Sequence, residues 1–500
     1  MNDIISIFEA SQNEYLSGKD KVYLKDTSQF FTPYDIACKM IETIDSRVFK
    51  VDSTINILEP SAGCGILIAA LVLNIAEKYK NIKKINIDLY EYDKTVFNIL
   101  SNNLNILNNY MLENYDIDLK FNILNENFIL KNSNTWTSSE SGEYDIIISN
   151  PPYKKINQTS PESKLMSSVV HGQPNIYTLF IAMCLKLLKK NGVYTVLSPR
   201  NYFSGEYSKK LRNFIFENYS LTHIYFFEKR SMFKSVNQEV IISTYINNKF
   251  NKQVDIHFDE NKCFLINFND IIFDKNLMSI VIPKNQNDLN LLKSFSKLKF
   301  SLTDLNLKIS VGPVVQFRNV NDIKKDLYDT NYAPLVISAD IQSNNRLIYF
   351  ERENKRKTHN KSISIDNKWI IKNSNYLVIR KVTAKDDIDL IVAAVLNRNY
   401  FNHSFLAFDN NLLYIHHLNK EDLDLNICYG LYCFINSSQF KKLYMLINGT
   451  HTINVTDFNN IKFPSYVSLI KLGKNILKIS DYSEKICTEL VEKYLNIKYK

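Results

Sequence analysis

The chain has 500 residues, of which 45% are hydrophobic and 23% charged, with a net charge of +9 and only 11 glycines and 11 prolines. This composition excludes a collagen-like or low-complexity chain and predicts about two to four globular domains, while the modest basic excess is compatible with nucleic acid as a partner. The seven cysteines are scattered, which predicts neither a disulfide framework nor a zinc site. We expect a cytoplasmic protein without a membrane partner, because the sequence shows no secretory signal pattern and no apolar run near about 18 residues.

The first clear element is a helix that begins within residues 29–44, QFFTPYDIACKMIETI. Thr32 is predicted to cap its amino end, and Pro33 suits its first turn. A second role for Thr32 beside a ligand cannot be read from the spacing.

Strand-like and helix-like segments then alternate up to about residue 250. The predicted strands are residues 55–58, 85–90, 144–149, 193–197 and 239–246, and the predicted helices are residues 66–79, 95–107 and 175–190. This alternation predicts an α/β domain with a parallel sheet covered by helices on both faces. Ligands of such sheets bind at the carboxyl ends of the strands.

The loop after the first strand reads ILEPSAGCGIL (57–67). Glu59 follows the strand, and Gly63 and Gly65 allow a tight turn into a helix. Ile68 stands where a dinucleotide-binding loop would have its third glycine, so the loop favours a small zwitterion over a pyrophosphate. A turn without any ligand is the alternative.

The next two strand ends also carry polar residues. Glu91 follows the glycine turn at roughly the spacing, about 20 residues, at which a carboxylate binds ribose hydroxyls. Asp93 is expected to cap the next helix. In NENFIL (125–130), Asn127 offers an amide and Phe128 an aromatic face for an adenine ring.

The strand at 144–149 runs into Asn150, Pro151, Pro152 and Tyr153. The side-chain oxygen of Asn150 and the carbonyl of Pro151 can accept both hydrogens of an amine on an aromatic ring, which frees the nitrogen lone pair for attack. Pro152 stiffens the turn, and Tyr153 offers a face on which a base can stack. The alternative is a strand that merely ends in prolines.

The rhythm changes after about residue 250, where short irregular strands and a basic run at 351–361 replace the alternation. We therefore divide the chain into residues 1–260 and a mixed α+β domain of residues 261–500.

Several motifs resemble those of the amino-group DNA methyltransferases, in particular the N6-adenine enzymes of gamma motif order such as the TaqI and XhoI methylases. FTP (31–33), LEPSAG (58–63) and NPPY (150–153) follow one another in that order, and residues 175–205 are similar to the stretch after NPPY. Residues 310–319, 376–387 and 448–465 resemble blocks of the XhoI-like target-recognition region. NPPY alone is shared with protein-glutamine and RNA methyltransferases.

The resemblance implies a class I, Rossmann-like domain that binds S-adenosylmethionine, followed by a target-recognition domain. It places Thr32 around the methionine portion of the cofactor, together with Glu59 and Ala62 from the loop that contains Gly63 and Gly65. It places Glu91 at the ribose, Asn127 and Phe128 at the adenine, and Phe203 opposite Tyr153 on a flipped base. Where this chain has Asn127, the family usually has Asp.

The implied activity is methyl transfer to N6 of adenine in double-stranded DNA, without a metal, as the modification half of a restriction-modification system. A monomer is expected because the chain has one target-recognition region. A separate cognate endonuclease is expected because no nuclease-like carboxylate cluster is found. The alternatives are a methyltransferase for protein glutamine or RNA, and a modification subunit that needs a specificity protein. Candidate DNA contacts are Arg318, Lys355, Arg356 and Lys357, although a charge run is usually only a solvated surface.

Overall fold

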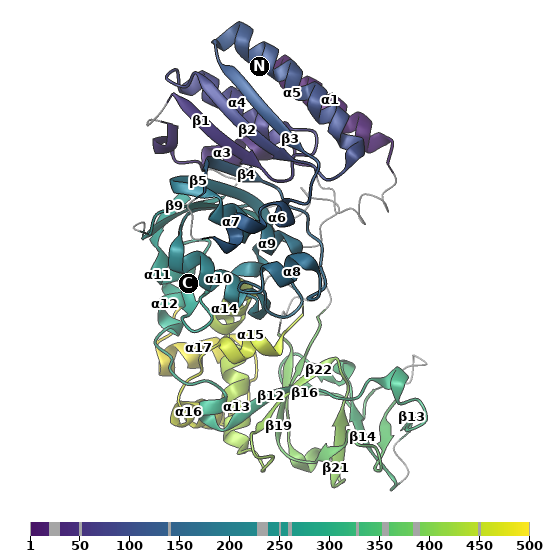
Figure 1. The fold of residues 1–500 in the computed structure, drawn as a ribbon. Helices are drawn as coiled ribbons and strands as arrows, with labels where there is room; N and C mark the ends of the chain where they lie inside the picture. Colours follow the sequence, from purple (N-terminus) through teal and green to yellow (C-terminus); the bar gives the residue numbers. More distant parts are fainter. Residues whose placement is uncertain are drawn as a thin grey trace. The chain divides into compact units, whose positions relative to one another are not determined.

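The computed structural model describes residues 2–19, 31–49, 53–138, 142–227, 239–249, 252–258, 263–326, 330–352, 360–383, 391–448 and 452–499. The chain divides into two compact units, Met1–Ile280 and Val281–Lys500 (Figure 1). The first unit therefore extends beyond residue 260, where the sequence suggested a division.

The first unit is built on one large sheet. Its strands are β1 (Thr54–Glu59), β2 (Lys84–Tyr90), β3 (Asp118–Leu124), β4 (Tyr144–Ser149), β5 (Leu188–Pro199), β6 (Ser220–Phe226), β7 (Val240–Ile246), β8 (Gln253–Phe258) and β9 (Cys263–Asn267). They are ordered β3-β2-β1-β4-β5-β7-β6-β8-β9. The first five strands are mutually parallel, whereas β7 runs antiparallel to both β5 and β6. The order reverses at β1, so a crevice forms outside the ends of β1 and β4.

Helices cover both faces of this sheet. They are α1 (Asn2–Ser17), α3 (Tyr34–Glu42), α4 (Ile66–Lys78), α5 (Lys94–Tyr115), α6 (Phe128–Lys131), α7 (Ser133–Thr137), α8 (Pro161–Leu165), α9 (Ile176–Lys186), α10 (Lys209–Asn218) and α11 (Phe268–Ile271). Ile146 and Ile148 of β4 join the core formed with α1, α3, α4 and α5. Ile147 points to the opposite face and is also fully buried. Burial on both faces explains why these strands read as continuous apolar runs.

All five strands expected from the sequence are present, and two corrections follow. The sheet is mixed rather than parallel, because the strand expected at 239–246 is the antiparallel β7. The helix expected at 175–190 ends at Lys186, because β5 begins at Leu188 and pairs there with Tyr144. A two-stranded sheet of β10 (Ile272–Asp274) and β11 (Ser279–Ile280) completes the first unit.

The second unit begins with one helix, continues with strands and ends with five helices among the described residues, as expected for an α+β domain. One sheet has the order β12-β22-β19-β20, another β13-β17-β14-β21-β18, and β15 pairs with β16. The strands are β12 (Leu307–Val311), β13 (Ile323–Lys324), β14 (Tyr332–Val336), β15 (Ile341–Gln342), β16 (Arg346–Leu347), β17 (Ser362–Ser364), β18 (Ile371–Lys372), β19 (Tyr376–Arg380), β20 (Ala393–Leu396), β21 (Phe405–Phe408) and β22 (Leu412–His417). The helices are α12 (Gln286–Phe295), α13 (Leu425–Ile435), α14 (Ser438–Ile447), α15 (Val455–Asn460), α16 (Tyr466–Ile479) and α17 (Glu484–Leu495).

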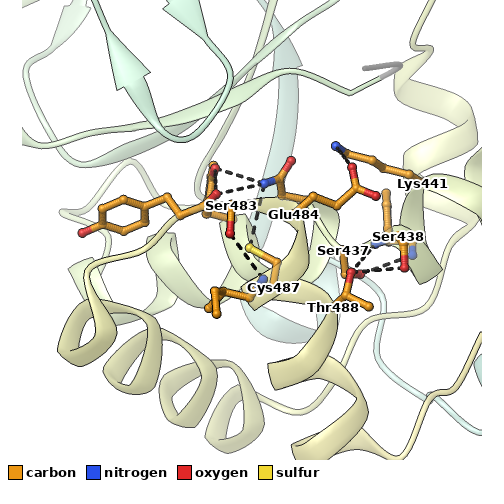
Figure 2. Close-up of polar contacts among 12 residues, drawn as sticks. Ser437, Ser438, Lys441, Ser483, Glu484, Cys487 and Thr488 are labelled. Atoms are coloured by element: carbon orange, nitrogen blue, oxygen red, sulfur yellow. Dashed lines mark hydrogen bonds and ion pairs between the residues drawn. The ribbon is translucent and has the colours of Figure 1, made fainter. Parts of the chain in front are cut away.

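Polar side chains join the amino ends of two of these helices (Figure 2). Ser437 caps α14 by accepting from the backbone N–H of Phe440 at 3.3 Å, and Lys441 pairs with Glu484 of α17 at 2.8 Å. The backbone N–H of Ser438 donates to Thr488 Oγ1 at 2.9 Å. Two of the backbone donors at the start of α14, those of Ser438 and Phe440, are thus satisfied within the bundle. Across the described part of the chain, no helix combines the length and the apolar character that a bilayer span requires.

Candidate active site

A cavity of about 670 Å³ opens in the first unit, at the carboxyl ends of β1, β2 and β4. Several residues singled out in the sequence line it: Thr32, Glu59, Ala62, Gly63, Glu91, Asn127, Phe128, Asn150 and Pro152. Its volume lies within the range of small-molecule sites, about 300–1,000 Å³. The polar residues predicted at the ends of separate strands therefore surround one cavity.

The loop between β1 and α4 forms one wall of this cavity. Gly65 has φ of 90°, and a Cβ there would lie 2.9 Å from Leu100 Cδ1. Gly63 has φ of 52°, and a Cβ there would lie 2.9 Å from Phe31 Cε1. Both positions favour glycine for their backbone conformation, and a Cβ at either would displace a neighbouring side chain. Gly65 itself does not line the cavity but shapes the turn.

Glu59, the last residue of β1, places a buried carboxylate in the cavity wall. The residue is 1% exposed, and its Oε2 has no hydrogen-bond partner among the described residues. Burial, and secondarily the neighbouring Glu91 carboxylate, raise the pKa of Glu59 well above its usual value. A buried carboxylate oxygen without a partner is costly, so a cationic ligand group would fit beside it.

Glu91 ties the loop to the end of β2. Its Oε2 accepts from the backbone N–H of Gly63 at 2.8 Å, and its Oε1 accepts from that of Asp93 at 2.7 Å. Burial raises the pKa of Glu91, and these two backbone hydrogen bonds oppose the rise. Asp93 caps α5 through Thr95 N at 2.8 Å, as the sequence predicted. The carboxylate of Glu91 thus holds the cavity wall together as well as lining it.

Asn127 and Phe128 form the wall beyond β3. Asn127 Oδ1 caps α6 by accepting from the backbone N–H of Ile129 and Leu130, both at 3.1 Å, and its Nδ2 donates to Glu162 Oε1 at 2.8 Å. One amide hydrogen of Asn127 remains for a ligand. The ring of Phe128 packs edge-on against Tyr90 at 5.1 Å and thereby presents an aromatic lining.

Thr32 does not cap the helix, contrary to the sequence prediction. The helix α3 begins at Tyr34 with Pro33 as its cap residue, and no side chain completes the cap. The Thr32 side chain lies one residue too early for that role, and its Oγ1 instead accepts from Asn150 Nδ2 at 3.1 Å. Thr32 is 5% exposed, so this contact is shielded from water.

The side-chain amide of Asn150 is held from two sides. Tyr153 donates its hydroxyl to Asn150 Oδ1 at 2.8 Å, and the same hydroxyl lies 3.1 Å from the carbonyl oxygen of Leu197. Burial, with a smaller contribution from Tyr177, raises the pKa of Tyr153 well above its usual value, so the hydroxyl stays protonated and donates. A carbonyl oxygen has two lone pairs, so Asn150 Oδ1 can accept more than one hydrogen bond.

The remaining candidates do not line the cavity. Pro151 and Tyr153 adjoin lining residues in the chain without lining it themselves. Phe203, in the short helix η2 (Arg200–Phe203), is 2% exposed, and the centre of its ring lies 4.4 Å from that of Tyr202. Arg318, in η6 (Gln316–Arg318) of the second unit, is exposed beside Phe317. Lys355, Arg356 and Lys357 lie outside the described residues.

The cavity also contains residues that sequence reasoning did not single out. They include Ser61, Tyr90, Lys154, Glu162 and Phe180. Ser61 donates its hydroxyl to the backbone carbonyl of Asn150 at 3.1 Å. Ser61 and Tyr90 stand next to predicted strand ends and could have been found there, whereas Glu162 and Phe180 carry no local signal.

Comparison with known proteins agrees with this geometry. Residues 50–233 match the family described as Eco57I restriction-modification methylase. The chain is 27% identical over 464 residues to the type II methyltransferase M.BsuBI of Bacillus subtilis, covering 91% of this chain and 90% of that protein. It is 26% identical over 511 residues to the type II methyltransferase M.PstI of Providencia stuartii, covering 99% and 98%.

Among solved structures, the cryo-electron microscopy structure of a DrdV–DNA complex resembles the chain with a TM-score of 0.52 and 13% identity, over 95% of this chain and 59% of that one. Together with the strand order, the family match confirms the expected Rossmann-like class I methyltransferase fold. The expected resemblance to methyltransferases of restriction-modification systems is likewise confirmed.

Proposed function

From the relation of this chain to the type II restriction-modification methyltransferases, we propose that it transfers the methyl group of S-adenosylmethionine to N6 of adenine at a specific site in double-stranded DNA. The observation that carries the proposal is the amide of Asn150, held by Thr32 and Tyr153 at the wall of a cavity that contains the unpartnered carboxylate of Glu59. The chain would act as the modification half of a restriction-modification system.

The cavity residues fit S-adenosylmethionine. The α-amino group of the cofactor would give Glu59 Oε2 the cationic partner that it lacks. Glu91 would bind the ribose, and Phe128 would pack against the adenine with the remaining hydrogen of Asn127 beside it. When bound, the cofactor supplies an electrophilic methyl group on a good leaving group, so we propose no metal in the transfer.

Asn150 and Pro151 would then orient the target amine. The side-chain oxygen of Asn150 and the carbonyl of Pro151 would each accept one N–H, which leaves the nitrogen lone pair pointing at the methyl group. The nitrogen would form the new bond to the methyl carbon as the bond from that carbon to the sulfur breaks, which leaves a neutral thioether, and the nitrogen would then lose a proton to water. Tyr153 is not the base, because its hydroxyl is protonated and donates to Asn150.

Access to the amine requires a flipped base, because pairing in the duplex hides it. Extrusion costs a few kcal/mol, which stacking on an aromatic ring recovers at about 1–3 kcal/mol per base. Tyr153 remains the proposed stacking face. Phe203 is buried, so its proposed place on the other side of the base requires its surroundings to move.

The second unit would choose the DNA site. Its exposed Arg318 lies with its guanidinium carbon 5.5 Å from the centre of the exposed Phe317 ring, a pair suited to phosphate or base contact. A separate endonuclease would cut the unmodified site.

The proposal is tested by incubating the full chain with labelled S-adenosylmethionine and either unmethylated duplex DNA, ribosomal RNA or cell protein. We expect label only in DNA, recovered after hydrolysis as N6-methyladenine at one recurring sequence. Asn150→Ala should abolish transfer and retain cofactor binding, whereas Asn218→Ala, on the exposed end of α10, should behave as wild type. Label in RNA or protein alone, or wild-type turnover by Asn150→Ala, would refute it.

A further inference from the structure

Three potential metal ligands lie together on strands β6 and β8, apart from the methyl-transfer cavity. In the parallel pairing of these strands, His223 is opposite Asp255 and Tyr225 is opposite His257. Asp255 and His257 are two residues apart and therefore share one face of β8. The register thus brings the imidazole of His223 to the same face of the sheet as the Asp255 carboxylate and the His257 imidazole, which lie more than 30 positions later in the sequence.

The three side chains already converge. One ligand atom from each lies within 4.8 Å of the other two, and His223 Nε2 is 3.6 Å from Asp255 Oδ2. The two imidazole rings lie at an angle of 27° with centres 6.0 Å apart. Ligands about 2.0–2.1 Å from a tetrahedral zinc ion are separated by about 3.3 Å, so side-chain rotation alone can complete the set.

The position is open to an ion from solvent. All three residues are partly exposed, and a cavity of about 500 Å³ reaches His223 and Asp255. Its lining includes Asp45, but Asp45 already pairs with Arg47 and is therefore not counted as a ligand. A water molecule in the cavity can take the fourth position.

We propose that His223, Asp255 and His257 bind one divalent transition-metal ion, with Zn²⁺ as the best match to two imidazoles and one carboxylate. The sequence predicted no zinc site because its cysteines lack a suitable spacing. That reasoning does not apply to a site made of two histidines and one aspartate. The ion would cross-link β8 to β6 and so stabilise the far part of the sheet.

The proposed metal site is separate from the proposed reaction. In the sheet order β4-β5-β7-β6, strand β6 lies three steps from β4, about 14 Å at the usual strand spacing. The site therefore predicts an effect of metal on stability, without a direct part in methyl transfer.

The test uses the untagged full chain after treatment with a chelator. Titration with Zn²⁺ in a calorimeter should show one ion per chain, and Zn²⁺ should raise the melting temperature. Asp255→Asn and His257→Ala should each weaken Zn²⁺ binding at least about 10-fold and should abolish the thermal shift. Loss of a residue that only supports a metal ligand already lowers metal affinity by about that factor. The control His171→Ala removes an exposed histidine of the same unit and should bind like wild type.

Asp255→Asn preserves side-chain size, so it separates loss of a ligand from loss of the fold, which circular dichroism checks for both variants. Replacing Zn²⁺ by Co²⁺ should add visible absorption bands typical of nitrogen and oxygen ligands, and these bands should be missing in His257→Ala. No stoichiometric binding by the wild type, or equal binding by wild type and Asp255→Asn, would overturn the proposal.

Discussion

Replacing Thr32 by valine removes one hydroxyl and almost preserves the shape of the side chain. Thr32 is 5% exposed, and its Oγ1 accepts from Asn150 Nδ2 at 3.1 Å. Without that acceptor the amide of Asn150 loses one of the contacts that orient it. A shielded polar group left without a partner costs about 1–3 kcal/mol. If this cost is felt in the transition state, the rate of transfer falls about 5- to 150-fold.

The assay is a single turnover of full-length protein with labelled S-adenosylmethionine and a DNA duplex, with cofactor affinity measured separately. The rate should fall while cofactor affinity changes little, and Thr32→Ser, which retains the hydroxyl, should recover most of the rate. Thr43→Val is the matched control, because Thr43 is also buried and lies at the other end of α3, where its Oγ1 is 2.6 Å from Thr244 Oγ1. Thr43→Val should lower the melting temperature and leave the rate of transfer unchanged. A rate for Thr32→Val within about twofold of wild type, roughly 0.4 kcal/mol, would refute the positioning role.

Three further variants test other parts of the structure. Glu59→Gln should weaken S-adenosylmethionine binding in a calorimeter at least about 10-fold, because it removes the negative charge that faces the amino group. Because burial raises the pKa of Glu59, the ligand-free wild type loses stability as the pH rises above the ordinary pKa of a carboxyl group. Glu59→Gln lacks this titration, so it should melt at a higher temperature than wild type at pH 8 but not at pH 4. Tyr153→Phe keeps the ring but not the donor to Asn150, so single-turnover rates should fall about 2- to 12-fold with DNA affinity unchanged, and an unchanged rate would contradict that contact. Arg352→Ala leaves Asp340, its partner at 3.0 Å, buried and uncompensated, so urea unfolding should show a loss of about 3–5 kcal/mol.

The sequence identified the parts of the fold that follow from apolar runs. Strands β1, β4 and β7 are buried on both faces, so their composition alone marks them. β3 was missed although DLKFNIL alternates polar and apolar residues with the period of a strand, whereas SLTHIYF of β6 mixes them without a regular period. The direction of β7 could not be read at all, because an antiparallel and a parallel buried strand have the same composition.

The cavity followed from the sequence because polar residues at the ends of parallel strands meet at one edge. Glu59, Glu91 and Asn150 were found in this way and line one space. Their detailed contacts were not predictable. The hydroxyl of Thr32 could cap its own helix or approach another element, and the choice depends on a contact with a residue 118 positions away. The His223, Asp255 and His257 cluster was missed for the same reason, since it depends on the register of two strands.

The arrangement around Asn150 shows why a short motif is not by itself a site. NPPY provides an amide and an aromatic hydroxyl, but a free asparagine side chain rotates, and its oxygen would face the substrate only part of the time. Here the start of α3 supplies an acceptor for Nδ2, while Tyr153, whose hydroxyl also contacts the Leu197 carbonyl in β5, supplies a donor to Oδ1. Three segments that are distant in sequence therefore fix the amide before any ligand binds. The entropy of orienting it is lost during folding rather than during each turnover, which is how pre-organised polar groups lower a reaction barrier.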